Sequence, residues 1–385
     1  MPQDAFSTRC PSSRIVFTIL LSLAACLCLA EAEQLPAEEM EVAKAKLLAW
    51  SCSLKSFAGS YTWEQFWPLE PDRKPISMAI TYRFQDGNRF LTYSMVVQKN
   101  DREVLASNTD AVLNGVVSNM SVTTDDERGT TVSGTIGLAW PRGWGMPDTA
   151  LIFPETLFGE LRGRPPLDQV LATGETTLHE YDGQRALHHV SGGHVLVIWL
   201  DEACRPSSYE TGFGSFTLDE IAERWPGDPF HVRDILDTVE LEDYVQIGGV
   251  SFPTKATKTD WSWDEQQKEV VLAQRETNAW DDLEFYVRYS TEVDKHVDVV
   301  QYFELDVASA KVNSELTEQA FQIDYPEDAI LFDADSKRVD LDGSIIAPPP
   351  LDSSTGIALR FAPVVGLAFA ILLLVVGALY WKTQH

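Results

Sequence analysis

The sequence is poor in cationic side chains. Its 385 residues include 30 Lys and Arg against 58 Asp and Glu, which gives a formal net charge of −28. Nucleic-acid binders need cationic side chains that meet phosphates, so this balance argues against that class. Hydrophobic residues make up 44% and charged residues 23%, which is typical of a globular chain rather than a disordered one.

Catalytic motifs are missing as well. The sequence has no Gly-x-Ser-x-Gly, no phosphate-binding loop and no His-Glu-x-x-His. Gly212-Phe-Gly214 lacks the third glycine and the βαβ setting of a dinucleotide site. We therefore expect no enzyme and no cofactor, although the many carboxylates prevent a test of paired-acid catalysis by counting.

The first 32 residues have the pattern of a secretory signal peptide. Arg9 and Arg14 precede the apolar run 15–30, and small residues follow at Ala30 and Ala32. The run is short for a bilayer span, which needs about 20 residues. We predict removal of residues 1–32, with cleavage after Ala30 as a close alternative.

Cysteine is scarce, with 5 in the chain. Cys10, Cys26 and Cys28 lie in the predicted signal. Cys26 ends a Leu-Ala-Ala-Cys box that resembles the one before a lipidated cysteine in bacterial lipoproteins, so lipidation is an alternative to cleavage. Cys52 and Cys204 remain, and an exported compartment permits a disulfide between them. Because Cys52 falls opposite the apolar stripe of its helix, two free thiols are the preferred prediction.

A second apolar run, residues 361–381, is uncharged and lies close to the end of the chain. At 1.5 Å per residue it reaches about 30 Å, the thickness of one hydrocarbon core. Tyr380 and Trp381 fall where an aromatic belt would lie, and Lys382 follows. We predict one transmembrane helix, with residues 382–385 as a cytoplasmic tail. A buried core helix and a removable tail for a glycolipid anchor are the alternatives.

The remaining chain divides into an exported domain and a linker. Pro348-Pro349-Pro350 and the Ser-rich stretch after it predict a linker over 347–360, so the domain covers 33–346. The cleaved signal places this domain on the periplasmic or extracellular side of the membrane. Residues 1–32 sum to zero charge and Lys382 adds one, so residues 33–360 carry −29. Such a field would repel anionic headgroups and hold the domain off the membrane surface.

The domain opens with an amphipathic helix. Apolar residues recur at intervals of three and four, which forms one stripe. Pro36 stands ahead of the helix and Gly59 just past its expected end. The stripe consists of Met40, Ala43, Leu47, Trp50, Leu54 and Phe57.

After this helix the apolar period becomes two, which is typical of strands. Asp86-Gly87, Asn114-Gly115 and Asp182-Gly183 join alternating segments and predict tight hairpins. Serial hairpins favour a large, twisted antiparallel sheet. Further strands are expected at Val195–Leu200, Val239–Ile247, Val250–Thr259, Glu269–Gln274, Leu283–Tyr289 and Val297–Val307. Short helices are expected between Pro154 and Leu171 and from the capping box Thr217–Glu220 to Trp225. The fold class is therefore α+β, with an incomplete β-barrel packed on helices.

Three stretches resemble the LolA-like superfamily of outer-membrane lipoprotein carriers. They run from Asp182-Gly183 to Arg205-Pro206, over Ile247-Gly-Gly-Val-Ser-Phe-Pro253, and from Asn313 to Asp333. The resemblance covers about residues 40–320 and consists of strand ends and turns. It implies a sheet that cups a lipid or acyl chain under a helical lid. This chain is longer than a minimal carrier and has its own predicted anchor, whereas a shuttle must diffuse.

The ligand-pocket or lid candidates come from one loop and one hairpin. Trp140-Pro-Arg-Gly-Trp144-Gly-Met146-Pro predicts either a mobile apolar lid or an ordinary loop pinned by its aromatic rings. Tyr82, Phe84 and Tyr93 are expected to line the pocket itself.

The candidate metal ligands favour structural roles. His188 and His189 are adjacent, so on a strand they point to opposite faces, and with His194 they are expected to be exposed strand histidines rather than a zinc site. The Asp333-Ala-Asp335 and Asp340-Leu-Asp342-Gly343 stretches look calcium-like. Counting back from Gly343 puts Arg338 at the first ligand position, so ordinary turns are expected.

The sequence thus predicts a membrane-anchored envelope protein that binds an apolar ligand, a lipid or lipoprotein acyl chain, in a curved-sheet cup. The alternative is a regulatory or protein-interaction ectodomain that senses envelope state through a membrane protein partner. An open apolar hollow favours the first prediction, and a filled interior favours the second.

Overall fold

A computed structural model describes most of the predicted exported domain. The described residues are 33–99, 102–125, 129–139, 151–159, 166–225, 229, 232, 234–333, 335 and 337–340. The predicted signal, linker, membrane span and tail, together with Trp140, Trp144 and Met146, lie outside them and stay predictions. In the part of the chain that is described, no helix is both long enough and apolar enough to cross a bilayer.

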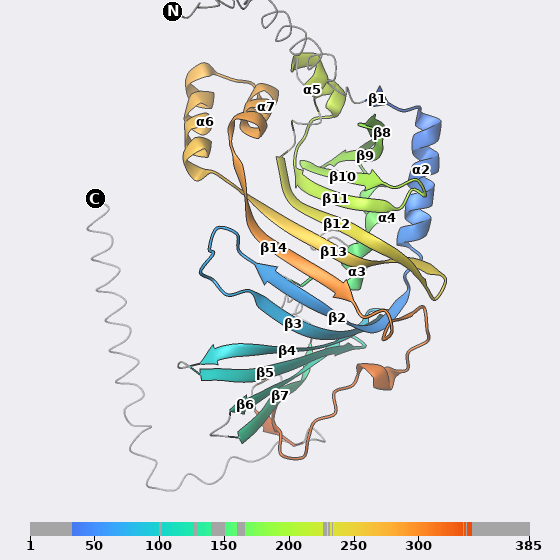
Figure 1. Cartoon of the computed structure of the whole chain (residues 1–385), viewed down its shortest axis with the longest axis vertical. Helices are drawn as coiled ribbons and strands as arrows, with labels where there is room; N and C mark the ends of the chain where they lie inside the picture. Colours follow the sequence, from blue (N-terminus) through green and yellow to red (C-terminus); the bar gives the residue numbers. More distant parts are fainter. Residues whose placement is uncertain are drawn as a thin grey trace, which may run out of the picture.

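The described strands form one long, curved sheet (Figure 1). Pairing runs in the order β1, β8, β9, β10, β11, β12, β13, β14, β2, β3, β4, β5, β6, β7, β16, β17, and β15 extends the β14 side of β2. Among the strands that the structure describes, only β16 pairs in parallel, with β7. The two end strands do not pair with each other, so the described sheet is open. The strands are β1 (Glu33–Gln34), β2 (Ser56–Phe66), β3 (Ile76–Gln85), β4 (Asn88–Lys99), β5 (Arg102–Leu113), β6 (Val116–Asp125), β7 (Gly129–Ala139), β8 (Glu175–Tyr181), β9 (Gln184–Ser191), β10 (His194–Leu200), β11 (Pro206–Phe213), β12 (Asp234–Ile247), β13 (Val250–Trp263), β14 (Lys295–Leu305), β15 (Lys311–Val312), β16 (Ile330–Phe332) and β17 (Arg338–Val339).

Helices cover one face of this sheet and one end of it. Helix α2 sends Ala43, Leu47 and Trp50 into the main core, beside the short helices α3 and α4. Helices α5, α6 and α7 group at the far end of β12, β13 and β14 (Figure 1). The helices are α2 (Ala37–Ser51), α3 (Pro154–Leu157), α4 (Leu167–Val170), α5 (Leu218–Arg224), α6 (Glu265–Asn278), α7 (Asp282–Glu292) and the 3-10 turn η2 (Glu318–Phe321).

The three predicted Asx-Gly hairpins are confirmed. They join β3 to β4, β5 to β6 and β8 to β9. Asp86 and Gly87 have φ of 52° and 80°, the left-handed pair that a two-residue hairpin turn requires. Glycine takes the second position because it pays no Cβ penalty there. The capping box at Thr217 and Glu220 is confirmed as the start of α5.

The predicted first helix is too long. Helix α2 ends at Ser51, and Leu54 and Phe57 lie beyond it. Phe57 instead belongs to β2, where it pairs with Phe84 and is fully buried. The helical spacing therefore continued by coincidence across the helix end. Gly59 lies inside β2, where an added Cβ would come within 2.8 Å of the Phe57 ring.

Two predicted strands are helices. Residues 269–274 lie in α6 and residues 283–289 in α7, which form a hairpin between β13 and β14. The Asp264 carboxylate accepts from the Gln267 amide to cap α6, and Asp281 caps α7 in the same way. The Glu, Gln, Lys and Arg content of α6 favours helix, whereas α7 is rich in Phe, Tyr and Val and begins as a helix at its Asp281 cap.

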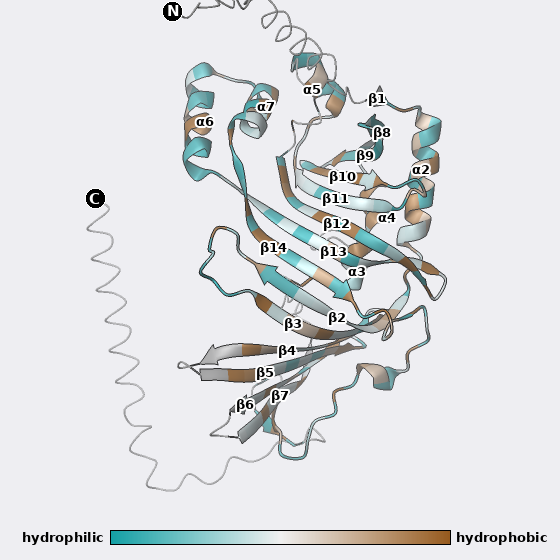
Figure 2. Ribbon diagram, in the orientation of Figure 1, coloured by the Kyte–Doolittle hydropathy of each residue, from teal (hydrophilic) through white to brown (hydrophobic). Residues whose placement is uncertain are grey.

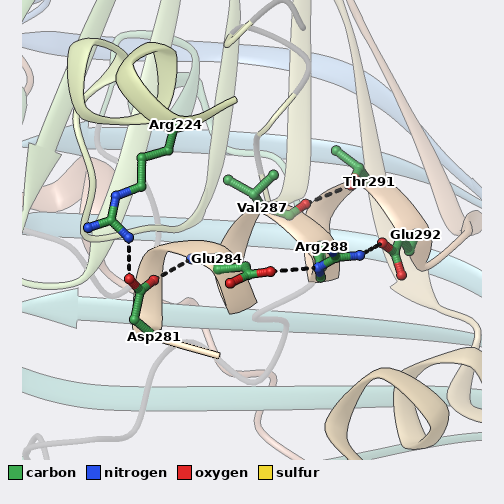
Figure 3. A network of polar contacts seen from close by, with 7 residues as sticks. All are labelled: Arg224, Asp281, Glu284, Val287, Arg288, Thr291 and Glu292. Carbon is green, nitrogen blue, oxygen red and sulfur yellow. Dashed lines mark hydrogen bonds and ion pairs between the residues drawn. The ribbon is translucent and has the colours of Figure 1, made fainter. Parts of the chain in front are cut away.

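Ion pairs tie this helical group together (Figure 3). Arg224 at the end of α5 pairs with Asp281 at the start of α7. Arg288 bridges Glu284 at 3.2 Å and Glu292 at 2.7 Å along α7. These side chains are half exposed and screened by water, so the pairs contribute little to stability.

The end of the described chain covers the convex face and one sheet edge. The Arg83 guanidinium donates to the Ala320 carbonyl at 2.8 Å. The Tyr325 hydroxyl donates to the Asn119 carbonyl at 3.0 Å and lies 3.2 Å from the Thr135 carbonyl. Strand β16 then pairs with β7. The β7 edge is therefore occupied along part of its length, which limits pairing with other chains.

Candidate functional site

The candidate site is the concave face of the sheet. Tyr82 and Phe84 are two residues apart on β3, and Tyr93 on β4 lies opposite Ile80. Residues two apart, and residues opposite each other, point to the same face. Tyr82 is 1% exposed, Tyr93 is 6% exposed and Phe84 is half-buried. The three described candidates thus share the concave face, but as packed core residues rather than as the lining of an open hollow.

Two segments fill this face. One is α2 and the other is residues 151–159, which contain α3. The Trp50 ring stacks on Phe158 at 4.3 Å, and Phe158 in turn contacts the Phe252 ring at 5.3 Å. Phe153 lies 5.0 Å from Tyr82. The expected apolar side chains are therefore present on the hollow side, and in the described part they are covered by the chain's own residues.

A buried polar cluster lies where residues 151–159 cross β3 and β4. The Tyr82 hydroxyl donates to Glu155 Oε1 at 2.6 Å, and Arg89 Nε lies 3.7 Å from the same oxygen. Glu155 is only 6% exposed. Burial raises the pKa of Tyr82 well above its ordinary value, and the Glu155 charge adds to this rise. The cluster is suited to binding a polar group at the border of the apolar interior.

Tyr61 adds a second hydroxyl near this carboxylate. Its ring packs on Phe303 at 4.5 Å, and its hydroxyl oxygen is buried with no hydrogen-bond partner among the described residues. Burial raises the pKa of Tyr61 well above its ordinary value, and Glu155 contributes in the same direction. This phenol is therefore neutral and can donate one hydrogen bond.

The concave face carries polar residues beyond β4. From Leu91 the register continues to Asp110 on β5 and to Asn119 on β6. From Tyr93 it continues to Asn108 and then to Ser121. Val112 on β5 and Val117 on β6 continue the apolar core on this face, so the polar residues interrupt the core rather than end it.

A second polar group lies on the concave side of β11, β12 and β13. Asp237 and Asp260 are opposite each other, and Lys258 lies between them, 3.2 Å from Asp237. The Thr211 hydroxyl donates to Asp237 at 2.9 Å. Burial raises the pKa of Asp260 to about 6, and the hydrogen bond to Asp237 adds to the rise. Burial pushes the pKa of Asp237 up as well, but the hydrogen bond from Asp260 and the Lys258 charge outweigh it, so its pKa is lowered.

Two of the three strand histidines are buried. The expectation of exposed strand histidines is therefore wrong for His188 and His189. His188 and His189 are each 2% exposed, and only His194 is exposed. His189 Nδ1 lies 2.8 Å from the Thr176 hydroxyl, and the His188 ring meets His179 edge-on at 6.4 Å. Their opposite orientation is as predicted. Among the described residues, no three His, Cys, Asp or Glu side chains are grouped closely enough to hold a metal ion.

Of the calcium-like stretches, Asp333 and Asp335 are described, whereas Asp342 and Gly343 lie outside the described residues. Asp333 Oδ1 accepts from the Asp335 and Lys337 amides, as expected of a turn. Cys52 is exposed and Cys204 is buried, and both are free thiols, as preferred from the sequence.

Sequence reasoning missed Glu155 and Arg89. Glu155 stands in the pattern Phe-Pro-Glu-Thr-Leu, where an acidic residue after Pro is an ordinary helix start. Burial of the segment on both sides would have identified Glu155 as unusual. That burial depends on tertiary structure and cannot be deduced from the local sequence.

Comparisons with known proteins find resemblance in structure alone. Searches with the sequence find no matching family model and no matching curated protein. A LolA superfamily protein from Nitrosomonas europaea aligns with a TM-score of 0.33 and 11% identity, over 74% of this chain and 99% of that one. A DUF1329 family protein from Desulfovibrio piger aligns with a TM-score of 0.31 and 9% identity, over 73% and 96%. A domain from Vibrio parahaemolyticus, described as an outer membrane lipoprotein-sorting protein, aligns with a TM-score of 0.31 and 11% identity, over 74% and 95%.

Proposed function

We propose that the chain is a membrane-anchored, non-catalytic envelope protein that binds an acyl chain or lipid between its curved sheet and residues 151–159. The observation that carries the proposal is the concentration of large apolar rings on both sides of this boundary. Phe153 and Phe158 face Tyr82 and Phe252 across it. An acyl chain offers the same apolar contact and could replace the side chains of the covering segment.

The covering segment is the element best suited to move. Its regular part is a single turn, residues 154–157, so it has little helical stability of its own. It is held by side-chain packing and by hydrogen bonds such as that from the Ser51 hydroxyl to the Phe158 carbonyl. Displacing it would free the apolar face and carry Glu155 away from Arg89 and Tyr82, so these two side chains would become available to a lipid's polar group.

The test is native mass spectrometry of the full chain after gentle extraction from its membrane. We expect co-purified lipid bound to the wild-type chain. The matched comparison is Phe153→Ala against Val270→Ala, since Val270 is 55% exposed on α6, away from the site. Lipid occupancy should change only in the Phe153 variant. Lipid-free protein in all three preparations would contradict the proposal.

One observation favours a second function. The described concave face is filled by the chain's own side chains, which is the arrangement expected of a regulatory or protein-interaction ectodomain. In that case, crosslinking in intact cells should join the chain to a membrane protein partner. A crosslinked partner on a chain that carries no lipid after extraction would favour this second function.

A further inference from the structure

The segment that covers the concave face combines one carboxylate with apolar side chains. Residues 151–159 carry Glu155 between apolar residues that include Phe153 and Phe158. Glu155 is 6% exposed, and its carboxylate accepts a hydrogen bond from the Tyr82 hydroxyl at 2.6 Å. A bond this short is typical of a hydroxyl that donates to an ionised carboxylate. A buried anion with apolar neighbours therefore already occupies this face.

The sheet holds this carboxylate with donors from two strands. Tyr82 is on β3, and Arg89, near the start of β4, has its Nε atom 3.7 Å from Glu155 Oε1. Arg89 lies opposite Phe84 and two residues from Leu91, so its side chain is on the concave face as well. The Arg89 side chain is 37% exposed, whereas that of Glu155 is 8% exposed. The positive charge therefore lies at the end of the site that reaches solvent.

One hydrogen-bond donor near the carboxylate is unused. Tyr61 on β2 lies opposite Ile80, which precedes Tyr82 on the concave face of β3, so the two phenols are diagonal neighbours. Tyr61 is 2% exposed, and its hydroxyl has no hydrogen-bond partner among the described residues. Burial raises the pKa of Tyr61, and the Glu155 charge adds to the rise, as expected of a phenol close to that carboxylate. Because an unpaired buried donor is destabilising, this hydroxyl is suited to an acceptor from outside the chain.

A row of aromatic rings leads away from the carboxylate across the concave face. The Phe57 ring lies 6.5 Å from the Tyr82 ring and 5.6 Å from the Phe252 ring. The Phe158 ring, which the covering segment supplies, lies 5.3 Å from Phe252 and 4.3 Å from Trp50 on α2. Figure 2 shows hydrophobic bands along both α2 and β3. Withdrawal of the covering segment would therefore leave a polar end at Tyr82 and an apolar course towards α2.

We propose that the ligand is a long-chain fatty acid whose carboxylate takes the place of Glu155 on Tyr82, Arg89 and Tyr61. This inference rests on the proposed function and names the class of its ligand. A carboxylate reproduces the contacts that Glu155 makes with Tyr82 and Arg89, and it gives the Tyr61 hydroxyl a partner. A neutral ester would remove the anion that Glu155 places beside Arg89, and a cationic head group would be repelled there. The covering segment and the ligand thus compete for one anion site.

The test uses palmitic acid, methyl palmitate, hexadecylamine and hexadecyl phosphate, which share one chain length and differ in the head group. They are mixed in equal amounts with the delipidated full chain in a non-ionic detergent, and native mass spectrometry measures the occupancy of each. The readout is the acid-to-ester ratio, because partition into micelles affects it equally in every variant. The variants are Tyr82→Phe, Tyr61→Phe, Arg89→Gln and Glu155→Gln. The control is Tyr302→Phe, since Tyr302 is 45% exposed on the convex face.

We expect the wild-type chain to favour the acid over the ester about 10-fold, because only the acid accepts hydrogen bonds as a charged group. Tyr82→Phe, Tyr61→Phe and Arg89→Gln should each lower this ratio several-fold, and Tyr302→Phe should leave it unchanged. Glu155→Gln weakens the competing segment, so it should raise the occupancy of acid and ester together without changing their ratio.

The outcomes separate this inference from the proposed function. Equal occupancy by all the ligands, or a preference for the ester, the amine or the phosphate, would overturn the carboxylate assignment and leave the proposed function standing. An unchanged ratio in both Tyr82→Phe and Arg89→Gln would do the same. Loss of acid binding in Glu155→Gln would also overturn it, because Glu155 would then belong to the ligand site rather than compete for it. Binding of none of the ligands would contradict the proposed function and this inference together.

Discussion

Replacing Phe158 by alanine separates packing from ligand binding. The Phe158 ring is 4% exposed and contacts the Trp50 and Phe252 rings. A buried Phe→Ala change costs about 3–5 kcal/mol, from lost transfer energy and the cavity that remains. The covering segment should therefore be held less tightly, and a lipid should fill the space that is left.

The matched control is Phe321→Ala on the convex face. Phe321 is 2% exposed, so its loss of stability should be similar. Denaturant unfolding of the two full-length variants in the same detergent gives the stability change, and native mass spectrometry gives the bound lipid. We expect equal destabilisation but more bound lipid only in Phe158→Ala. Equal lipid occupancy in the two variants would refute the assignment of the ligand to the Phe158 side of the sheet.

Three further predictions concern the described domain. Tyr325→Phe removes the hydroxyl that donates to a strand carbonyl, so it should lower the free energy of unfolding by about 1 kcal/mol in denaturant titration; no change would mean that the segment after η2 is not fixed by this bond. Burial raises the pKa of Asp234 to about 6 against the opposing effect of nearby lysines, so its folded state binds more protons and stability should rise as pH falls from 6 towards 4. Asp234→Asn should remove up to about 3 kcal/mol of that rise, and an unchanged pH profile would contradict the assignment. Thiol titration of the native chain should modify Cys52 at once and Cys204 only after unfolding, and simultaneous labelling would contradict the burial of Cys204.

Local chemistry made the hairpins predictable. Asn-Gly and Asp-Gly determine turn geometry within two residues, so the β3–β4, β5–β6 and β8–β9 connections follow from the sequence. The same holds for the Thr217 capping box, whose two hydrogen bonds lie within one helical turn.

Long-range packing was not predictable in the same way. Phe57 continues the helical stripe of α2 in sequence, but its partner Phe84 is 27 residues away and fixes it in a strand. The α6–α7 hairpin alternates enough to suggest strands, and its caps at Asp264 and Asp281 were the local signals that should have decided.

The candidate site was only partly visible for the same reason. Tyr82, Phe84 and Tyr93 could be placed on one face because strand alternation is local. The coverage of that face by residues 151–159 could not be inferred, since it depends on how a distant segment returns to the sheet. The Glu155 cluster exists only in that tertiary arrangement.

The position of a bound acyl chain tests the central claim most directly. A photoactivatable fatty acid can be crosslinked to the full chain in detergent, and the modified residues can be mapped by peptide mass spectrometry. The account predicts crosslinks on residues 151–159 and on the concave side of β3 and β4, around Tyr82. Crosslinks confined to 361–381, or to the convex face alone, would contradict it.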